Sequence, residues 1–345
     1  MKYSDYVIER GATLAEALET LENNEFKALI LEEDGILLGI LTDGDIRRFL
    51  LKQGRMTDPV EKAVTKNPKY VSGYHEKPAR DLLDRLDCTV VPMLDNSGRV
   101  HALVFNDVTV HRMRDDISNP VIIMAGGFGT RLHPYTEILP KPLIPVGRTT
   151  ITELIIDRFR KFGCQDITLV LGHKKNLIKA YFSEVDMDYS LSFADEEQPL
   201  GTGGGLALFK GKYDGPVFVT YCDNVIEADY REILSSHEKD GSALTVVVAK
   251  KTVSIPYGVI DISKEGEITA VREKPVENYF INTGFYVVSQ AFIDIVEDNK
   301  FQHITDLIEK CRSKGLRVGS YLVEEDCFTD IGQLKDLEAL GNSLG

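Results

Sequence analysis

The beginning of the chain shows first a helical and then a strand-like spacing of apolar residues. Residues 13–21 (TLAEALETL) carry their apolar side chains on one helical face: Leu14, Ala17, Leu18 and Leu21. Two short apolar runs follow at 28–31 and 36–41, with a turn between them, and these are typical of paired strands. The segment TDGDIRRFL then predicts a second helix.

The same order of elements recurs about 60 residues further along the chain, which indicates an internal duplication. The second copy has a helix, a strand, a turn and a strand at 79–86, 89–94, 96–98 and 100–105. Two half-units of this kind usually pack face to face, because each buries apolar surface that the other cannot bury alone. We therefore expect a duplicated module at the start of the chain.

The segment GILTDGDIRR, Gly39 to Arg48, closely resembles the signature of CBS domains. The resemblance implies a tandem CBS (Bateman) pair over residues 1–116. Such pairs commonly bind adenine nucleotides in the cleft between the repeats. The residues that would contact the nucleotide here are Thr42, Asp45 and, in the second copy, Asp107.

The second copy departs from this signature, with His101 and Val104 at the usual positions of glycine and threonine. One ligand site could therefore be lost. Two further alternatives stay open. Thr42 and Asp45 could simply cap the helix that begins near Ile46, or the pair could serve only for dimerisation.

The second part of the chain has a different pattern. Residues 111–119 (HRMRDDISN) are polar and precede a proline, so we interpret them as a linker. From Val121 onward, short apolar runs alternate with amphipathic segments, which is typical of a parallel sheet covered by helices. We expect an α/β fold, with a Rossmann-like domain over residues 117–345 built on a mixed, mostly parallel sheet.

The first helix of this domain has clear ends. Thr150 and Glu153 can form a capping box, and Gly163 follows the last apolar turn. In open α/β sheets ligands bind beyond the carboxyl ends of the strands. We expect the active site there.

A glycine-rich loop follows the first strand of this domain, in the stretch AGGFGTRLHPYTEILPKPLIPVG. The glycines at 126, 127 and 129 let backbone N–H groups approach triphosphate oxygens closely. Arg131 offers a planar fork of donors to phosphate, and Lys141 adds a point charge between two prolines. The stretch lacks the Lys-Ser or Lys-Thr of a Walker A loop and the spacing of a dinucleotide-binding fingerprint.

This stretch resembles the GGxGTRLxPxTxxxPKPL signature of sugar-phosphate nucleotidyltransferases, and the resemblance extends over residues 120–345. It implies three catalytic residues: Arg131, Lys141 and Asp223. It also implies that the nucleotide is bound by Ala125, Gly126, Gly127, Gly129, Thr130, Glu196, Leu200 and Gly201. In the loop PLGTGGG, Leu200 and Gly201 would lie against the base, and Glu196 or Glu197 would accept hydrogen bonds from a guanine edge.

The same resemblance implies Mg²⁺ as the cofactor, held by Asp223 in TYCDN and Asp330 in FTDIG. It assigns the sugar phosphate to Tyr257, Gly258, Glu273, Lys274, Asn282 and Thr283. Glu273 and Asn282 would hold hydroxyl or amino groups of the sugar, and Lys274 would hold its phosphate.

Taken singly, these residues have simpler explanations. The two aspartates could cap helices, Glu273 and Lys274 could form a solvated ion pair, and Asn282 could form a turn. Their occurrence in the order that the family requires favours the active-site interpretation. Cys222, which replaces a more usual glycine, has no visible histidine partner and the reaction needs no thiol nucleophile.

A sugar 1-phosphate is already largely dianionic at neutral pH, because its second pKa is about 6, and its oxygen needs no general base. We therefore expect in-line attack of this oxygen on the α-phosphorus of a nucleoside triphosphate, with release of pyrophosphate. The PKPL and PLGT segments favour guanylyltransferases. CBS repeats ahead of such a domain resemble the enzymes that make GDP-glucosamine for bacterial legionaminic acid synthesis.

The expected substrates are therefore GTP and glucosamine 1-phosphate. Mannose 1-phosphate with GTP is the near alternative, and the use of UTP or dTTP is a farther one. A non-catalytic nucleotide-sensing regulatory protein is the alternative of another class. Retention of both aspartates together with Arg131 and Lys141 argues against a pure sensor.

The composition, 43% hydrophobic and 27% charged, is ordinary for a globular protein. A formal net charge of −14 repels nucleic acid and anionic membranes, so a polyphosphate needs local cations, backbone amides and a metal. The five cysteines are scattered and read as reduced thiols. No apolar run approaches the roughly 18 residues that cross a bilayer, and no signal peptide is visible. We expect a cytoplasmic homo-oligomer that binds neither nucleic acid nor membranes.

Overall fold

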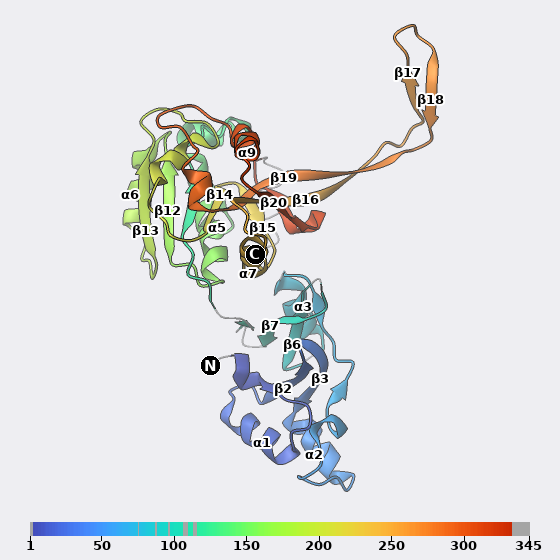
Figure 1. The fold of residues 1–345 in the computed structure, drawn as a ribbon. Coiled ribbons are helices and arrows are strands. Elements are labelled where there is room, and N and C mark those ends of the chain that lie inside the picture. The colour runs from blue at the N-terminus through green and yellow to red at the C-terminus, as the bar shows by residue number, and fades with distance from the viewer. Residues whose placement is uncertain are drawn as a thin grey trace. The chain divides into compact units, whose positions relative to one another are not determined.

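The computed structural model describes residues 3–74, 76–86, 88–95, 97–105, 110–112 and 116–332. Contacts within the chain divide it into two compact units, Met1–Asp115 and Asp116–Gly345 (Figure 1). In the described residues, no helix is both long enough and apolar enough to span a membrane.

The first unit contains two four-stranded sheets with the same topology. In the labels that follow, η denotes a short 3-10 helix. The first repeat consists of η1 Tyr3–Tyr6, β1 Val7–Ile8, α1 Leu14–Asn23, β2 Ala28–Glu33, β3 Ile36–Thr42, α2 Asp43–Leu51, η2 Val60–Lys62 and β4 Thr65–Lys66. The second consists of β5 Val71–Ser72, α3 Glu76–Leu86, β6 Val90–Leu94, β7 Val100–Phe105 and β8 Val110–Arg112. In each sheet the first strand is parallel to the second, and the later neighbours are antiparallel. The internal duplication is confirmed.

The two repeats bury apolar surface against each other, as expected. One core cluster combines Tyr6 and Ile30 of the first repeat with Val100 and Phe105 of the second. The ring of Phe26 stacks on that of Phe105 with centroids 4.2 Å apart. Because these side chains come from both sheets, neither repeat has a complete core alone.

The second unit is built on a seven-stranded sheet in the order β13-β12-β9-β14-β19-β16-β20. Its strands are β9 Val121–Met124, β12 Asp166–Leu171, β13 Ser190–Asp195, β14 Val217–Tyr221, β16 Leu244–Ser254, β19 Val276–Val288 and β20 Val318–Val323. Only β19 runs against its neighbours β14 and β16, and the other described pairs are parallel. The prediction of a mixed, mostly parallel sheet is confirmed.

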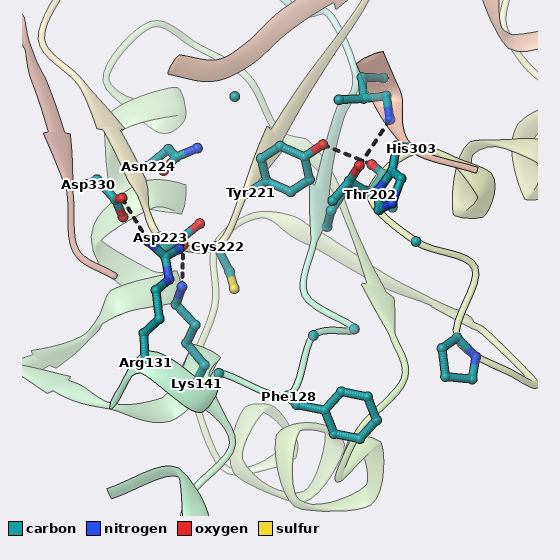
Figure 2. A pocket seen from close by; sticks show the side chains of 18 of the residues that line it. Phe128, Arg131, Lys141, Thr202, Tyr221, Cys222, Asp223, Asn224, His303 and Asp330 are labelled. Carbon is teal, nitrogen blue, oxygen red and sulfur yellow. Dashed lines mark hydrogen bonds and ion pairs between the residues drawn. The ribbon is translucent and has the colours of Figure 1, made fainter. Parts of the chain in front are cut away.

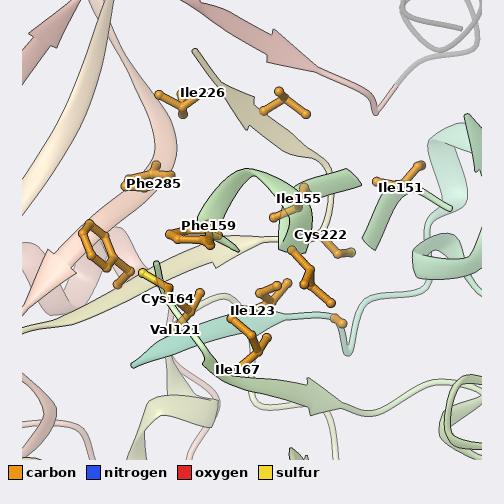
Figure 3. Packing of buried hydrophobic residues seen from close by; sticks show 14 of the residues in the cluster. Val121, Ile123, Ile151, Ile155, Phe159, Cys164, Ile167, Cys222, Ile226 and Phe285 are labelled. Atoms are coloured by element: carbon orange, nitrogen blue, oxygen red, sulfur yellow. The ribbon is translucent and has the colours of Figure 1, made fainter. Parts of the chain in front are cut away.

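Helices cover both faces of this sheet. They are η3 Thr130–Leu132, α4 Tyr135–Ile138, η4 Lys141–Leu143, α5 Ile151–Arg160, α6 Lys175–Ser183, η5 Gly204–Phe209, α7 Tyr230–Asp240, α8 Gln290–Ile293, α9 Ile304–Ser313 and η6 Glu325–Cys327. Along β9, Ile123 faces a core with Phe159 of α5 (Figure 3), while Ile122 faces a second core with Leu307 of α9. The alternating side chains of one buried strand therefore serve two helical layers.

The predicted capping box at the start of α5 is present. The Thr150 hydroxyl accepts from the Glu153 amide at 3.2 Å, and the Glu153 carboxylate accepts from the Thr150 amide at 2.7 Å. Gly163 follows the helix with a φ of +97°, which favours glycine at such a stop.

Three two-stranded pairs complete this unit. They are β10 Pro145–Val146 with β11 Thr149–Thr150, β15 Asn224–Ile226 with β21 Phe328–Asp330, and β17 Val259–Ile262 with β18 Ile268–Arg272. The last pair lies at the end of a long projection formed by the outer parts of β16 and β19 (Figure 1). We call residues 250–281 the arm, and none of them is buried.

Candidate active site

A cleft of about 710 Å³ lies at the carboxyl ends of the parallel strands of the second unit (Figure 2). Residues that follow β9, β13 and β14 line it, together with the bases of β19 and β21 and the segment before α9. Its position agrees with the rule that open α/β sheets bind ligands at this edge.

The glycine-rich loop after β9 forms one wall of the cleft. Gly129 has a φ of +67°, and a Cβ built there would lie 2.9 Å from side-chain carbons of both Lys141 and Thr136. The Thr136 hydroxyl donates to the Gly129 carbonyl at 2.9 Å. Glycine is therefore required for the loop to pack directly on the Lys141 segment.

Lys174, which was not among the predicted site residues, holds the segment that follows the glycine-rich loop. The Lys174 ammonium donates to the carbonyls of Thr136, Glu137 and Ile138 at 3.0, 2.6 and 3.1 Å. These carbonyls lie at the end of α4, where backbone acceptors have no helical partner. Lys174 follows β12 and belongs to no recognised motif, so sequence reasoning could not single it out.

Asp223 and Asp330 are brought together by strand pairing. Asn224 lies opposite Asp330 in the antiparallel pair of β15 and β21. The Ile331 amide also donates to the Asp223 carbonyl at 2.8 Å. No described helix begins directly after Asp223 or Asp330, and the Asp330 carboxylate accepts from the Gly332 amide at 2.7 Å.

Two cations face these carboxylates (Figure 2). The Arg131 guanidinium lies 3.2 Å from Asp330 Oδ2 and 3.5 Å from Asp223 Oδ2, and thus bridges them. Lys141 Nζ forms an ion pair with Asp223 Oδ2, and both residues are only 9% exposed. The two cations predicted for the triphosphate and the two aspartates predicted for the metal therefore meet at one place.

The two carboxylates fit a Mg²⁺ ion. Both present Oδ2 to a common cation, and Mg²⁺ is usually held by one or two carboxylates together with substrate phosphates and water. Among the described residues there is no cluster of three or more His, Cys, Asp or Glu side chains that could hold a metal without such help.

The Cys222 thiol does not take part as a nucleophile. Burial and the neighbouring Asp223 carboxylate raise the pKa of Cys222 to about 12. The thiol is therefore neutral at physiological pH, and a neutral thiol is a weak nucleophile.

Glu196 is a buried carboxylate of the cleft lining that lies against the glycine-rich loop. A Cβ at Gly126 would lie 2.7 Å from Glu196 Oε2, and one at Gly205 would lie 2.5 Å from Oε1. Burial raises the pKa of Glu196 to about 7, although a hydrogen bond from the Leu200 backbone opposes this shift. Of the two candidates Glu196 and Glu197, only Glu196 lines the cleft, and Glu197 is exposed.

The predicted base-binding loop packs on the segment before α9. The Gln302 amide donates to the Leu200 carbonyl at 2.9 Å, and the Gly203 amide donates to the Gln302 carbonyl at the same distance. Gly201 has a φ of +78°, and a Cβ there would lie 2.6 Å from the Gln302 carbonyl oxygen. This pairing brings Phe301 into the cleft lining.

Several lining residues were missed by sequence reasoning, among them Phe128, Thr202, Tyr221, Phe301 and His303. Thr202 and Tyr221 lie inside quoted motifs, and the Tyr221 hydroxyl donates to the Thr202 carbonyl at 2.9 Å (Figure 2). Phe301 and His303 carried no signal, because only their pairing with a loop 100 residues earlier places them here.

Two of the six residues assigned to the sugar phosphate line the cleft, Asn282 and Thr283. Asn282 accepts from the Gly284 amide and donates to the Tyr286 hydroxyl, both at 2.9 Å. The Thr283 hydroxyl is buried and donates to the Val247 carbonyl at 2.8 Å. Thr283 therefore holds β19 against β16, and Asn282 does form a turn-like contact.

The other four residues assigned to the sugar, Tyr257, Gly258, Glu273 and Lys274, lie on the arm and not in the cleft lining. Gly258 and Glu273 are neighbours across the arm, because a Cβ at Gly258 would lie 3.1 Å from Glu273 Oε2. Their role in binding sugar stays a prediction.

In the first unit, Thr42 caps α2, which begins at Asp43. The Asp45 carboxylate accepts from the Thr42 amide at 2.9 Å and from the Thr65 hydroxyl at 3.0 Å. Burial opposes ionisation of Asp45, but hydrogen bonds from Thr42, Arg48 and Thr65 hold its pKa below the usual value. The capping alternative thus describes these contacts, and nucleotide binding stays a prediction. Asp107 lies outside the described residues.

Comparison with known proteins gives two family matches. A family described as nucleotidyl transferase matches residues 120–344, and the CBS domain family matches residues 1–52. The mannose-1-phosphate guanyltransferase of Pichia angusta is 33% identical over 228 residues, covering 62% of this chain and 61% of that protein. The Candida albicans protein of the same name is 34% identical over 185 residues, covering 51% of each. The chain thus spans between half and two thirds of the length of these relatives.

Solved structures share the fold. HddC from Yersinia pseudotuberculosis matches with a TM-score of 0.52 and 23% identity, covering 66% of this chain and all of that one. A second HddC structure, complexed with GMP-PN, matches with a TM-score of 0.51. At this level of identity the likeness concerns the fold alone.

Proposed function

The chain belongs to the nucleotidyl transferase family, and from this premise we propose that it joins a sugar 1-phosphate to a nucleoside triphosphate in the cytoplasm. The products are a nucleotide sugar and pyrophosphate. The observation that carries this proposal is the convergence of Arg131, Lys141, Asp223 and Asp330 beside the glycine-rich loop.

Different parts of the cleft bind the phosphates and the base of the triphosphate. The open backbone at Gly127, where nothing lies within 4 Å of a built Cβ, leaves room for phosphate oxygens. Arg131 and Lys141 face the same space and neutralise charge on the β- and γ-phosphates as pyrophosphate departs. The base lies against Leu200 and Gly201, where the Glu196 carboxylate accepts hydrogen bonds from N1–H and the 2-amino group of guanine.

The reaction is a direct displacement. An oxygen of the sugar phosphate forms a bond to the α-phosphorus, and the bond from that phosphorus to the bridging oxygen of pyrophosphate breaks. The attacking oxygen is already ionised near neutral pH, so the chain supplies position and charge rather than a base. Asp223 and Asp330 would hold Mg²⁺, which when bound neutralises the reacting phosphates.

For the substrates we propose GTP and glucosamine 1-phosphate, in a pathway to a bacterial surface glycan such as legionaminic acid. GTP is supported by the relatives named mannose-1-phosphate guanyltransferase and by the buried carboxylate of Glu196 in the cleft. Glucosamine is supported by the CBS sequence ahead of the transferase domain. Mannose 1-phosphate is the second candidate, because those relatives are named for it.

A matrix of triphosphates against sugar 1-phosphates, with Mg²⁺ and a pyrophosphate readout, tests this proposal. We expect the highest kcat/KM with GTP and glucosamine 1-phosphate. Higher kcat/KM with mannose 1-phosphate would correct the sugar, and higher kcat/KM with UTP or dTTP would correct the base. Absence of pyrophosphate release with every pair would overturn the transferase function.

For the first unit we propose binding of AMP or ATP through Thr42, Asp45 and Asp107. A ligand at Asp45 has to compete with the hydrogen bonds from Thr42 and Thr65. Calorimetry with each nucleotide tests this. Heat of binding with a rise in melting temperature is expected, and no heat with either nucleotide would remove the proposal.

A further inference from the structure

Lys174 departs from two local rules at the start of α6, just after β12 (Figure 1). Its φ of +52° and ψ of +30° lie in the left-handed region, which residues other than glycine and asparagine rarely adopt. It also places a positive charge at the N-terminus of a helix, where the helix dipole disfavours cations. A residue that costs local stability in both ways is typical of a functional position.

The ammonium of Lys174 is used in full by the turn at α4. It donates to the carbonyls of residues 136, 137 and 138 at 3.0, 2.6 and 3.1 Å. A lysine ammonium has three N–H donors, so none is left for a substrate phosphate. Lys174 also lies outside the cleft lining. It can therefore affect the reaction only through the segment that it holds.

That segment, residues 133–140, connects the two cations of the cleft, Arg131 and Lys141. Three of its large apolar side chains are 56%, 77% and 37% exposed: Tyr135, Ile138 and Leu139. A segment with few buried apolar contacts has low local stability. Packing against the core therefore does little to fix the path of the chain before Lys141, and polar contacts have to do so.

The chain on the two sides of Lys141 is held differently. After it, the Pro142 carbonyl accepts from the buried Thr152 hydroxyl at 2.9 Å, and Leu143 belongs to the core. Before it, the side-chain hydrogen bonds that tie the described residues 133–140 to other segments are those of Thr136 with the Gly129 carbonyl and those of the Lys174 ammonium. The position of the earlier side thus depends on Lys174.

Residues 172–174, which we call the bracket, also contact the glycine-rich loop. The His173 amide donates to the Gly126 carbonyl at 3.2 Å. A Cβ at Gly172 would lie 2.9 Å from the same carbonyl oxygen. The bracket therefore contacts both phosphate-binding elements, the glycine-rich loop through its backbone and the turn at α4 through the Lys174 ammonium.

We propose that Lys174 is a positioning residue, which holds the chain before Lys141 in place against the glycine-rich loop. This inference rests on the proposed function. A cation stabilises developing charge best when it is already in place, because it then needs no reorganisation during the reaction. A displacement of about 1 Å at a reacting centre can lower the rate by about 100-fold. The local cost of Lys174 is thus offset by a preorganised site for pyrophosphate.

The variant Lys174→Asn tests this role. Asparagine adopts the left-handed region more easily and carries no charge at the helix N-terminus, so the midpoint of urea unfolding should stay close to that of the parent. We expect kcat to fall by about tenfold or more, because Lys141 is no longer held in place. The KM for the sugar 1-phosphate should stay close to the parent value, since the lost effect is specific to the transition state.

Two matched variants accompany it. Lys174→Arg keeps donors for the same carbonyls and should recover most of the parent kcat. Lys175→Met removes the next lysine of the chain, which pairs with Asp195 at 3.2 Å, and should keep the parent kcat.

A double-mutant cycle shows whether Lys174 acts through Lys141. In a Lys141→Met background, Lys174→Asn should lower the single-turnover rate by less than about twofold, because the cation that it positions is already gone. Hydrogen exchange supplies a readout that does not depend on turnover. The amides of residues 134–141 should exchange faster in Lys174→Asn than in Lys175→Met.

Three results would overturn the inference: the parent kcat in Lys174→Asn, the same fold loss in the parent and Lys141→Met backgrounds, or unchanged exchange at residues 134–141. Absence of turnover by the parent chain would instead contradict the proposed function, and this inference with it.

Discussion

Asp330 lies opposite Asn224 in the pair formed by β15 and β21, and this register places its carboxylate beside that of Asp223. The two residues are more than 100 positions apart in the chain, yet both carboxylates contact the Arg131 guanidinium. The position of Asp330 thus depends on the pairing of two short strands, of which β15 also buries Val225 and Ile226 in the core.

We predict that Asp330→Asn lowers kcat by about two orders of magnitude with little change in stability, because the amide is a poorer metal ligand on a partly exposed strand. Pyrophosphate release over a range of Mg²⁺ concentrations checks this, and thermal unfolding serves as the control. A variant that turns over at the parent rate at low Mg²⁺ would remove Asp330 from the metal site.

The two cations of the cleft differ in burial, so their loss has different consequences. Lys141 is 9% exposed and paired with buried Asp223, whereas the side chain of Arg131 is 58% exposed. Removing one partner of a buried pair leaves an uncompensated charge, so Lys141→Met lowers the free energy of unfolding by about 3 kcal/mol.

Arg131→Met is the matched variant. Arg131→Met and Lys141→Met are expected to lose transferase activity to a similar degree. Arg131→Met should nevertheless keep the parent midpoint of urea unfolding, because a surface ion pair contributes little to stability. Equal loss of stability in both variants would contradict the expectation that the buried pair of Lys141 and Asp223 makes Lys141→Met the more destabilising change.

Sequence and structure agree most closely where the signal is local. The capping box of Thr150 and Glu153 spans four residues. Its two hydrogen bonds depend only on this short segment and on a helix that begins after Thr150, so distant contacts are not needed to predict it. The glycines at 126 and 129 follow the first strand directly, so their place at the sheet edge follows from the order of elements.

The unpredicted parts depend on contacts between distant segments. His303 enters the cleft only because Gly201 lets a loop approach Gln302, and no periodicity reports such an approach. The arm could not be foreseen either, since β16 and β19 have the composition of buried strands but extend beyond the sheet.

Glu196 predicts a pH dependence of guanine recognition. Burial raises its pKa to about 7, so the carboxylate is ionised above that pH and protonated below it. Only the ionised form accepts from both guanine donors. The KM for GTP is therefore expected to be constant above neutral pH and to rise by up to about tenfold per pH unit below it.

The Glu196→Gln variant distinguishes protonation of Glu196 from other causes of lost activity at low pH. The variant should bind GTP more weakly, lose the acid limb of the KM profile, and discriminate less between GTP and inosine triphosphate, which lacks the 2-amino group. Glu197→Gln, at the exposed neighbouring position, should behave like the parent. An unchanged profile in Glu196→Gln would assign the titration to another group.

Gly284 lies where β19 passes the metal-binding edge, and its replacement tests how closely this strand must approach. Its φ is +76°, and a Cβ there would lie 2.2 Å from Asn224 Nδ2 and 2.6 Å from the Tyr221 ring. Gly211 has a similar φ of +63° but nothing within 4 Å of a built Cβ. Alanine at either position costs about 1 kcal/mol of backbone strain.

Only Gly284→Ala also displaces Asn224, the residue opposite Asp330, and so disturbs the two metal carboxylates. We expect Gly284→Ala to lower kcat at least about tenfold, because small misplacements at a reacting centre are costly, while Gly211→Ala keeps the parent kcat. Urea unfolding of both variants measures the shared strain. If the two variants retained the same kcat, the close approach of β19 to Asn224 would have no part in positioning the site.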